Sequence, residues 1–481
     1  MDAHRSRRRT AVVLVAAWIW LGGSSSAQLP LQAGNVMTTY CPDLTGVNGS
    51  PNPAGDAVIH VDVFPPGPLG ANWLAPFFSN AGAPPAEVWN YGNLGSVFGI
   101  AIDNNSDIYV TSSTVYGNFG AFTFGPDGGG AVYRLDGVSG NIDPWMTTGT
   151  GVVGTNTLLN SAPAGVTPPG LGDICYDSVF NQFFVSNFAD GRIYRVKTVA
   201  NQGIVQAVND PFLPYPYSGS PTFAPLGERV WAVHVATIPI FVNRLTQAMK
   251  RVLLFSVWLR DNGRQNTPWP ASWPLTLLSA ANNAIFSWEM DSQGALVAGG
   301  PRLYCVMPYL KDGVSLGYSN PVSDITSLGA SIYFAERTIG ANYGQVGSGH
   351  LARVLRLNAF PNKAGVVVIT GPPFQWPDPF DYRYRVGDWA SPRGWNCAGG
   401  VAICRPSQFA FGPPSIWTTG DALKGLSSGN AIYGLQWIPG GGNVSCAPYS
   451  SCTLLIDLDH QINTPNKAQQ GDVECIWTNA H

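Results

Sequence analysis

Five charged side chains lie where they could act on a ligand. Asp173 and Asp324 each open a short apolar segment, Glu289 lies within another, and Glu336 and Arg337 follow a fourth. Two carboxylates that act with neutral oxygen atoms can bind a hard cation such as calcium, and a half-buried acid can serve as a general base. The residues therefore predict a calcium site on Asp173 and Asp324, or acid-base chemistry. A solvated loop pair is the alternative for Glu336 and Arg337, and Glu289 is equally compatible with a structural role.

Other recognisable catalytic residue sets are absent from the sequence. No histidine has a spacing that suggests a second metal ligand or a nucleophilic serine, and there is no Gly-x-Ser-x-Gly elbow. No Gly-rich phosphate loop occurs between a strand and a helix. An enzymatic interpretation depends on carboxylates alone, so the catalytic residues stay unknown and catalysis is an open question.

Two segments, near residues 264 to 280 and 370 to 405, are rich in aromatic residues. Their most prominent rings are those of Trp269, Trp273, Trp376, Tyr382, Tyr384 and Trp389. Exposed aromatic rings stack on sugars or fill pockets on partner proteins, and arginines among them add directed hydrogen bonds. We predict that these insertions bind protein or carbohydrate. The alternative is that they pack over the ends of the fold.

Eight cysteines in an exported chain indicate disulfide bonds. Two cysteine pairs flank short glycine-rich loops, and a third pair lies near the two ends of the mature chain. The predicted bridges are Cys397 with Cys404, Cys446 with Cys452, and Cys41 with Cys475. Cys175 and Cys305 lie in strand-like segments, where pairing and buried thiols are equally good interpretations.

The first 27 residues have the layout of a secretory signal peptide. Basic residues between 4 and 9 precede an apolar stretch at 11 to 21, and small residues end the segment at Ala27. The apolar stretch is about half of the roughly 20 residues that span a bilayer, so no transmembrane anchor is expected. We expect a secreted protein, or a periplasmic one in a Gram-negative host, with candidate glycosylation sites at Asn48, Asn104 and Asn443.

The composition excludes one class of partner and suggests another. The chain has 26 basic and 29 acidic residues, which leaves no basic surface for nucleic acid. Hydrophobic residues make up 45% of it, which together with 56 glycines and 39 prolines favours a turn-rich β protein. Charged residues are only 11%, against about 25% in typical domains. A surface so poor in charge predicts glycan cover or self-association.

The elements that must position these residues follow an internal repeat. Each copy combines a short apolar strand, a polar turn, a β-branched and aromatic strand, a variable loop and a third alternating strand. The first copy reads Gly-Ile-Ala-Ile-Asp, then Asp-Ile-Tyr-Val-Thr, then Ala-Val-Tyr-Arg-Leu, between residues 99 and 135. Three more clear copies begin near residues 173, 324 and 408, and two weaker ones near residues 222 and 287.

A single copy cannot bury its own faces, so the copies must stack. We predict an all-β, six-bladed β-propeller over residues 57 to 481, after an N-terminal extension at residues 28 to 56. Strands at residues 57 to 64 and 453 to 458 fit no copy, and we expect N- and C-terminal strands to close the ring. A bridge between Cys41 and Cys475 would reinforce that closure. Seven blades, or a pair of β-sandwiches, are the alternatives.

The repeat resembles the NHL-type repeats of the regucalcin/gluconolactonase, strictosidine synthase-like and virginiamycin B lyase-like propellers, over roughly residues 57 to 460. The resemblance implies the architecture alone. It does not imply an activity, because such propellers include enzymes, ligand binders and interaction modules alike. It also implies that the first strand of each repeat lines a central channel and opens at the ligand-bearing face. The opening residues here are Gly99, Asp173, Pro221, Ser287, Asp324 and Gln408.

The same resemblance implies roles for the acids. Asp173 and Asp324 are similar to the ligands of the regucalcin-like metal site, and Glu336 is similar to the acid that follows the second strand in the lyase-like propellers. The two aspartates lie one residue later than in that metal site, and one residue in a strand reverses the direction of a side chain. The alternative is that Asp173 and Asp324 hydrogen-bond the backbones of neighbouring blades.

The leading hypothesis is a secreted, non-catalytic binding or structural propeller that engages protein or carbohydrate through its loop face and aromatic insertions. One alternative is a metal-dependent hydrolase or lyase in the channel, with Asp173, Asp324 and Glu289 as ligands or bases. The other is a self-assembling extracellular surface or filament subunit.

Overall fold

The structure is a computed structural model of the whole chain. It describes residues 31, 33–41, 52–63, 66–80, 87–115, 124–147, 170–212, 224, 228–241, 247–258, 283–308, 319–337, 351–358, 380–388, 394–404, 415–424, 432–440, 442, 446, 448–458 and 469–476. The predicted signal peptide therefore lies outside the described residues. So do Asn48, Asn443, Trp269, Trp273, Trp376 and Trp389.

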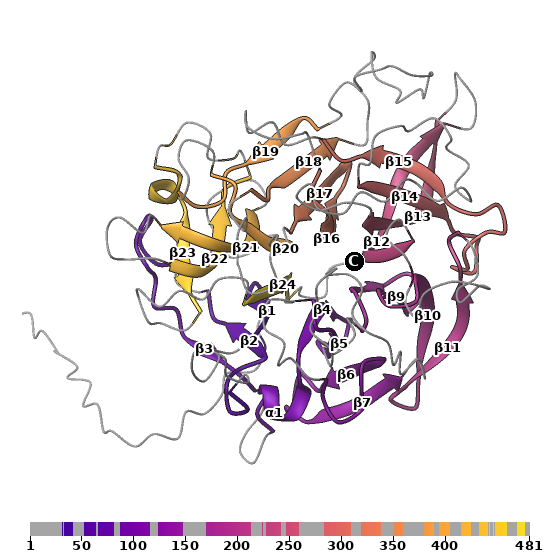
Figure 1. Cartoon of the computed structure of the whole chain (residues 1–481), viewed down its shortest axis with the longest axis horizontal. Coiled ribbons are helices and arrows are strands. Elements are labelled where there is room, and N and C mark those ends of the chain that lie inside the picture. The colour runs from indigo at the N-terminus through magenta and orange to yellow at the C-terminus, as the bar shows by residue number, and fades with distance from the viewer. Residues whose placement is uncertain are drawn as a thin grey trace, which may run out of the picture.

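Six sheets of four antiparallel strands are arranged radially around a central axis, so the chain is a six-bladed β-propeller (Figure 1). From the axis outward, blade 1 consists of β24 (Gln470–Cys475), β1 (Val36–Tyr40), β2 (Val58–Val61) and β3 (Phe77–Phe78). Blade 2 consists of β4 (Val97–Ile102), β5 (Ile108–Ser112), β6 (Ala131–Leu135) and β7 (Ile142–Thr147). Blade 3 consists of β8 (Ile174–Asp177), β9 (Gln182–Asn187), β10 (Arg192–Val199) and β11 (Gln202–Asn209).

Blades 4 to 6 repeat the same order, with the first strand of each blade innermost. Blade 4 consists of β12 (Arg229–Phe241), β13 (Gln247–Trp258), β14 (Ala284–Glu289) and β15 (Arg302–Val306). Blade 5 consists of β16 (Val322–Leu328), β17 (Ser331–Glu336), β18 (Val354–Asn358) and β19 (Tyr382–Tyr384). Blade 6 consists of β20 (Cys397–Cys404), β21 (Ser415–Lys424), β22 (Ile432–Ile438) and β23 (Leu454–Asp457). The short helices α1 (Tyr91–Leu94) and η2 (Tyr449–Cys452) complete the described elements, and none of these helices is long and apolar enough to cross a membrane.

The predicted six-bladed all-β fold is confirmed, but the predicted boundaries of the two weak repeat copies are wrong. The weak copies near residues 222 and 287 together form the single blade 4. Its first hairpin has strands of 13 and 12 residues, about twice the usual length, so the expected spacing of turns is missing. In blade 6 the innermost strand is β20, and Gln408 lies outside the described residues.

The ring is closed by strands from both ends of the chain, as predicted. The C-terminal strand β24 is the innermost strand of blade 1 and pairs with β1, Val36 lying opposite Cys475. The closing strands differ from the segments at 57 to 64 and 453 to 458, which contain β2 of blade 1 and β23 of blade 6. Because β1 lies at residues 36 to 40, the propeller includes part of the segment expected to precede it.

One predicted disulfide is confirmed and two are wrong. Cys446 is bonded to Cys452. Cys404 is bonded to Cys475, with 5.6 Å between their Cα atoms, which replaces the predicted pairs Cys397 with Cys404 and Cys41 with Cys475. Cys397 and Cys404 lie at opposite ends of β20, and an extended strand of that length holds its ends about 20 Å apart. Cys175 and Cys305 are buried thiols.

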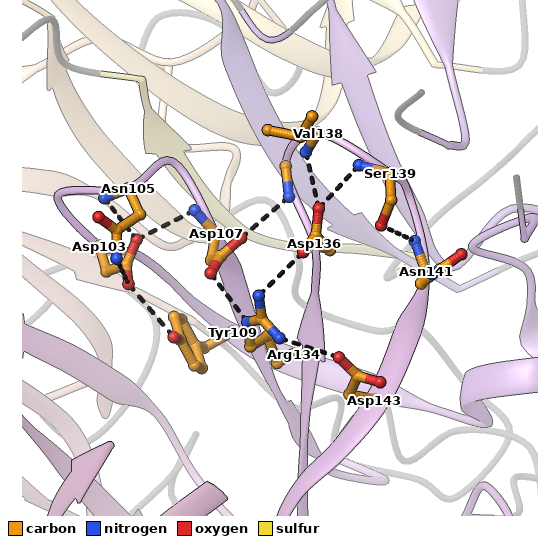
Figure 2. A network of polar contacts seen from close by, with 11 residues as sticks. Asp103, Asn105, Asp107, Tyr109, Arg134, Asp136, Val138, Ser139, Asn141 and Asp143 are labelled. Carbon is orange, nitrogen blue, oxygen red and sulfur yellow. Dashed lines mark hydrogen bonds and ion pairs between the residues drawn. The ribbon is translucent and has the colours of Figure 1, made fainter. Parts of the chain in front are cut away.

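Arginines of the repeat tie strands together within a blade. Figure 2 shows Arg134 of β6 in blade 2, where Nε lies 2.8 Å from Asp107, Nη2 2.9 Å from Asp136 and Nη1 2.9 Å from Asp143. Asp103 accepts the backbone N–H groups of Asn105 and Asp107 and so shapes the turn between β4 and β5. The third strand of blade 2 is thereby ion-paired to the turn before β5, to the turn after β6 and to β7.

The outer strand of every blade is short or interrupted. β3, β19 and β23 have two, three and four residues. The longer outer strands β7, β11 and β15 each carry one extra residue, which breaks their register with β6, β10 and β14. Short edges and bulges prevent one sheet from pairing with another, so the described blade edges are poorly suited to edge-to-edge assembly.

Candidate functional site: the central channel

The six innermost strands place equivalent residues in one layer around the axis. The equivalent residues are found by aligning the pairing of the first two strands in each blade. In blade 3, Ile174 pairs with Val185, and in blade 5, Ile325 pairs with Phe334; the layer residue of each blade comes directly before this first-strand residue. The same rule applies to all six blades. In order around the ring, the layer consists of Asp472, Gly99, Asp173, Ala232, Asp324 and Gly400. Aspartate alternates with a residue that has little or no side chain.

A hydroxyl group on the second strand links neighbouring blades. In blade 2, Thr111 accepts the N–H of Gly99 at 2.9 Å and donates to the carbonyl of Gly172 in blade 3 at 2.8 Å. The equivalent hydroxyls in the other blades are those of Thr39, Ser186, Ser256 and Thr419. Blade 5 has Ala335 at this position, and there Ser323 donates to the carbonyl of Gly399 at 2.7 Å instead.

The three aspartates bind the next blade as well as their own strand. Asp173 accepts the N–H of Ile174 at 2.7 Å and that of Val233 in blade 4 at 3.0 Å. Asp324 accepts the N–H of Val401 in blade 6 at 2.6 Å. Asp472, which the sequence analysis missed, accepts the N–H groups of Val473 and, in blade 2, Ile100. The alternative interpretation of Asp173 and Asp324, hydrogen bonds to neighbouring blades, describes their contacts.

Burial and mutual repulsion raise the pKa values of these acids. Desolvation raises the pKa of Asp324 to about 6 and raises the pKa values of Asp173 and Asp472, which the charge of Asp324 raises further. Glu474, two residues along β24, is partly exposed, and burial together with Asp324 raises its pKa to about 8.

These carboxylates do not fit a calcium site. Their oxygen atoms already accept backbone N–H groups, which a cation would have to displace. Within the described ranges, no group of three His, Cys, Asp or Glu side chains is arranged to hold a metal ion. Calcium binding by Asp173 and Asp324 stays a prediction, and the geometry gives it no support.

Arg337 closes the channel at the end where the innermost strands begin. Its guanidinium donates to the carbonyls of Ala398 in blade 6 and, at 2.7 Å, Gln470 in blade 1. It also lies 5.4 Å from the ring centre of Phe98 in blade 2, opposite its own blade. Phe98 contacts Trp231 of blade 4, and all three side chains are at most 3% exposed. Arg337 is therefore a buried plug and not part of a solvated loop pair.

Glu336 has a separate, structural set of contacts. Both of its carboxylate oxygens accept from the guanidinium of Arg353, at 2.5 and 2.7 Å, and the two side chains are almost completely buried. Asn320 donates to the same carboxylate at 3.3 Å. The pair fixes the start of β18 against the end of β17, so Glu336 faces the blade interior.

Glu289 does not reach the channel. It lies on β14, the third strand of blade 4, with its carboxylate 3.6 Å from Nζ of Lys250. The prediction of a channel base at this position is wrong, because Ala284–Glu289 forms the third strand of blade 4 and not an innermost strand. No described contact links Glu289 to Asp173 or Asp324.

The described part of the second aromatic insertion combines packing with a surface. Tyr384 is fully buried, 4.5 Å from the ring of Tyr382, so it packs the blade. Farther along, Arg385 lies 4.7 Å over the ring of Tyr449 in η2, and Trp395 lies 5.7 Å from the guanidinium of Arg353. Arg385, Trp395 and Tyr449 are partly exposed. We call these three side chains the insertion-base cluster.

Asn104 is the one predicted glycosylation site among the described residues. It is exposed in the turn between β4 and β5. That position is accessible to a glycosylating enzyme, and glycosylation itself stays a prediction.

Sequence reasoning missed two acids of the innermost strands and one pair of polar side chains. Asp472 and Glu474 lie in the last strand, where Gly471-Asp472-Val473 repeats the pattern Gly172-Asp173-Ile174 and so carried a usable signal. His234 of β12 lies 2.8 Å from the hydroxyl of Ser327 in β16, and burial lowers its pKa to about 4. No sequence spacing could reveal that pair, because 93 residues separate its members.

Comparisons with known proteins add little to this geometry. No protein-family model matches the chain, and no curated protein sequence is significantly similar to it. Among solved structures, it is similar to a chain of a nidogen/laminin complex, with 9% identity, TM-score 0.40, and coverage of 93% of this chain and 100% of the other. It is also similar to the periplasmic gluconolactonase of Pseudomonas aeruginosa, with 11% identity, TM-score 0.35, and coverage of 92% and 98%. For a putative 6-phosphogluconolactonase of Bacteroides uniformis, the identity is 9%, the TM-score is 0.33, and the match covers 92% of this chain and 100% of the other. Likenesses this distant carry no argument about what the chain does.

Proposed function

We propose that the chain is an exported binding propeller that engages carbohydrate, or alternatively protein, through the loops at the plugged end of the ring. The observation that carries the proposal is the use of the channel's charged groups. Asp173, Asp324 and Arg337 all bond the main chain of other blades. Groups committed to holding the ring are poor candidates for catalysis, so we assign them a structural role.

The insertion-base cluster supports a ligand surface outside the channel. Arg385, in the segment after β19, contacts Tyr449 in η2 of the next blade. The cluster presents two partly exposed aromatic rings and one partly exposed guanidinium group, that of Arg385, because the guanidinium of Arg353 behind Trp395 is buried against Glu336. Aromatic rings stack on the apolar faces of sugars, and guanidinium groups hydrogen-bond hydroxyl or carboxylate oxygens. Two disulfides are typical of proteins outside the cytoplasm, where such ligands are found.

A glycan array of immobilised oligosaccharides tests the proposal. We expect the full-length mature protein to bind a restricted set of glycans, and Trp395→Ala combined with Tyr449→Ala to lose at least tenfold in affinity, about 1.4 kcal/mol. Tyr176→Ala, which removes a partly exposed tyrosine from blade 3, serves as the control. Equal binding by both variants would overturn the proposal, and binding to protein ligands alone would support its second form.

Two simpler measurements address the other hypotheses. The blunted outer strands argue against assembly through blade edges, so we expect a monomer by light scattering. Metal analysis by mass spectrometry tests the channel hydrolase or lyase: stoichiometric calcium that disappears in Asp173→Ala would favour the enzyme over the binding protein.

A further inference from the structure

A serine and a histidine meet at the side of the channel, between blades 4 and 5. Nε2 of His234, on β12, lies 2.8 Å from Oγ of Ser327, on β16. The two residues follow Ala232 and Asp324, members of the layer that contains the three channel aspartates, along their innermost strands. Both are partly exposed, whereas Ala232 and Asp324 are buried. The pair therefore lies beyond that layer, on the side away from the plug formed by Arg337.

The hydroxyl of Ser327 differs from the hydroxyls that hold the ring together. Those of Thr111 and Ser256 each accept an N–H of their own blade and donate to a carbonyl of the next blade. In the described part of the chain, the hydroxyl of Ser327 bonds the imidazole of His234 and no main-chain group. Because Ser256 already joins blades 4 and 5, the contact between Ser327 and His234 is additional to the joint between these blades.

The imidazole of His234 is available to accept a proton. Burial, and to a smaller extent the positive charge of Arg251, lower the pKa of His234 from 6.5 to about 4, so the ring is neutral at physiological pH. A neutral imidazole with its proton on Nδ1 accepts the hydroxyl proton at Nε2. No carboxylate hydrogen-bonds His234 among the described residues, so the two side chains form a dyad without the acid of a triad. A base of low pKa is weak, so we expect slow acyl transfer.

Apolar side chains occupy the positions equivalent to Ser327 in the neighbouring innermost strands. Aligned by strand pairing, these positions in blades 2, 3 and 4 are those of Ile102, Tyr176 and Val235. All three side chains are partly exposed, as that of Ser327 is. Ligand sites combine such apolar lining with a few polar groups that fix orientation. The lining favours an uncharged substrate with a small apolar group over a charged one.

We propose that Ser327 is a nucleophile for small carboxylic esters and that His234 is its general base. His234 removes the hydroxyl proton as Oγ bonds to the carbonyl carbon, and the carbonyl oxygen takes up the displaced electron pair. When the C–O bond to the alcohol breaks, the alcohol leaves with the proton from His234, and an acyl-serine remains. Water then attacks the acyl group by the same route, which releases a carboxylic acid and restores the hydroxyl. This activity goes beyond the proposed binding function and does not rest on it.

A fluorophosphonate probe tests the nucleophile in the full-length mature protein, because it reacts with activated serines and forms a stable phosphonyl ester. We expect mass spectrometry with peptide mapping to place the probe on Ser327, and the protein to hydrolyse p-nitrophenyl acetate above the buffer rate. Ser327→Ala should abolish both signals, and His234→Gln should slow labelling by at least about 100-fold. Ser331→Ala is the matched control, because it removes another partly exposed serine from the adjoining strand β17 and should label as the wild type does.

Three results would overturn the dyad. The first is wild-type protein that takes up no probe, the second is a probe attached only to residues other than Ser327, and the third is equal labelling of wild type and a folded His234→Gln. Circular dichroism establishes that each variant is folded, and peptide mapping of the wild-type protein decides the case where His234→Gln does not fold. We expect Ser327→Ala to bind glycans as the wild type does, so failure of the dyad and failure of the binding surface give different results.

Discussion

The hydroxyl that joins blade 6 to blade 1 offers a sharp test of how the ring is held. Thr419 accepts the N–H of Gly400 at 2.9 Å and donates to the carbonyl of Gly471 at 2.9 Å. Thr419→Val keeps the shape of the side chain and removes the oxygen. The change leaves a buried donor and a buried acceptor without a partner, each of which costs about 1–3 kcal/mol. We therefore expect the free energy of unfolding to fall by about 2–4 kcal/mol.

Thr419→Ser is the control for this prediction. It keeps the hydroxyl and deletes one methyl group, which costs about 1 kcal/mol. Equilibrium unfolding in guanidinium chloride, followed by tryptophan fluorescence, gives both differences from the shift in midpoint at a shared slope. The reasoning fails if Thr419→Val is no less stable than Thr419→Ser. Blade 5 gives an internal comparison, because it has Ala335 at this position and is joined to blade 6 by a hydrogen bond from Ser323 instead.

Three further predictions concern the closure, the histidine of blade 1 and the glycines of the channel. Replacing Cys404 and Cys475 by serine should lower the free energy of unfolding by about 4 kcal/mol, because their disulfide closes a long loop. The same replacement at Cys446 and Cys452, which close a short loop, should lower it by about 2 kcal/mol. Thermal or denaturant unfolding that gave the reverse order would contradict the disulfide assignment. Burial lowers the pKa of His60 from 6.5 to about 4, so its contribution to stability is present above pH 6.5 and lost as pH falls through 4, and His60→Gln should flatten the acid side of the stability curve. Gly400→Ala should destabilise by about 1–3 kcal/mol, because its Cβ would lie 2.8 Å from the backbone N of Val473, whereas Gly299→Ala, with nothing within 4 Å, should be neutral in the same assay.

The fold was predictable wherever strand and turn lengths stayed regular. Blades 2, 3 and 5 each place three strands close to the positions of the repeat, because their apolar strands are four to eight residues long and end at polar turns. Blade 4 departs from this rule, since its 13-residue β12 continues past the point where a turn was expected. Blade 1 has no copy in the sequence at all, because its strands lie at opposite ends of the chain.

The site was less predictable than the fold because its contacts join distant segments. The position at the start of a strand identified Asp173 and Asp324 in the sequence. Their hydrogen-bond partners, the backbone N–H groups of Val233 and Val401, lie 60 and 77 residues farther along the chain, so the sequence could not show them. Arg337 follows a strand and has the sequence context of a loop residue. Its plug position depends on Gln470, 133 residues later.

The alternation of residues in the channel explains why three aspartates, and not six, surround the axis. A Cβ atom on Gly99 would lie 2.6 Å from Cα of Asp173, and one on Gly400 would lie 2.9 Å from Cα of Asp472. An aspartate on one innermost strand therefore requires a glycine, or at most Ala232 before Asp324, on the strand before it. Each aspartate in turn supplies the acceptor for an N–H of the blade that follows. The ring is thus held by three aspartate-to-small pairs, each of which joins one blade to the next through a backbone N–H group.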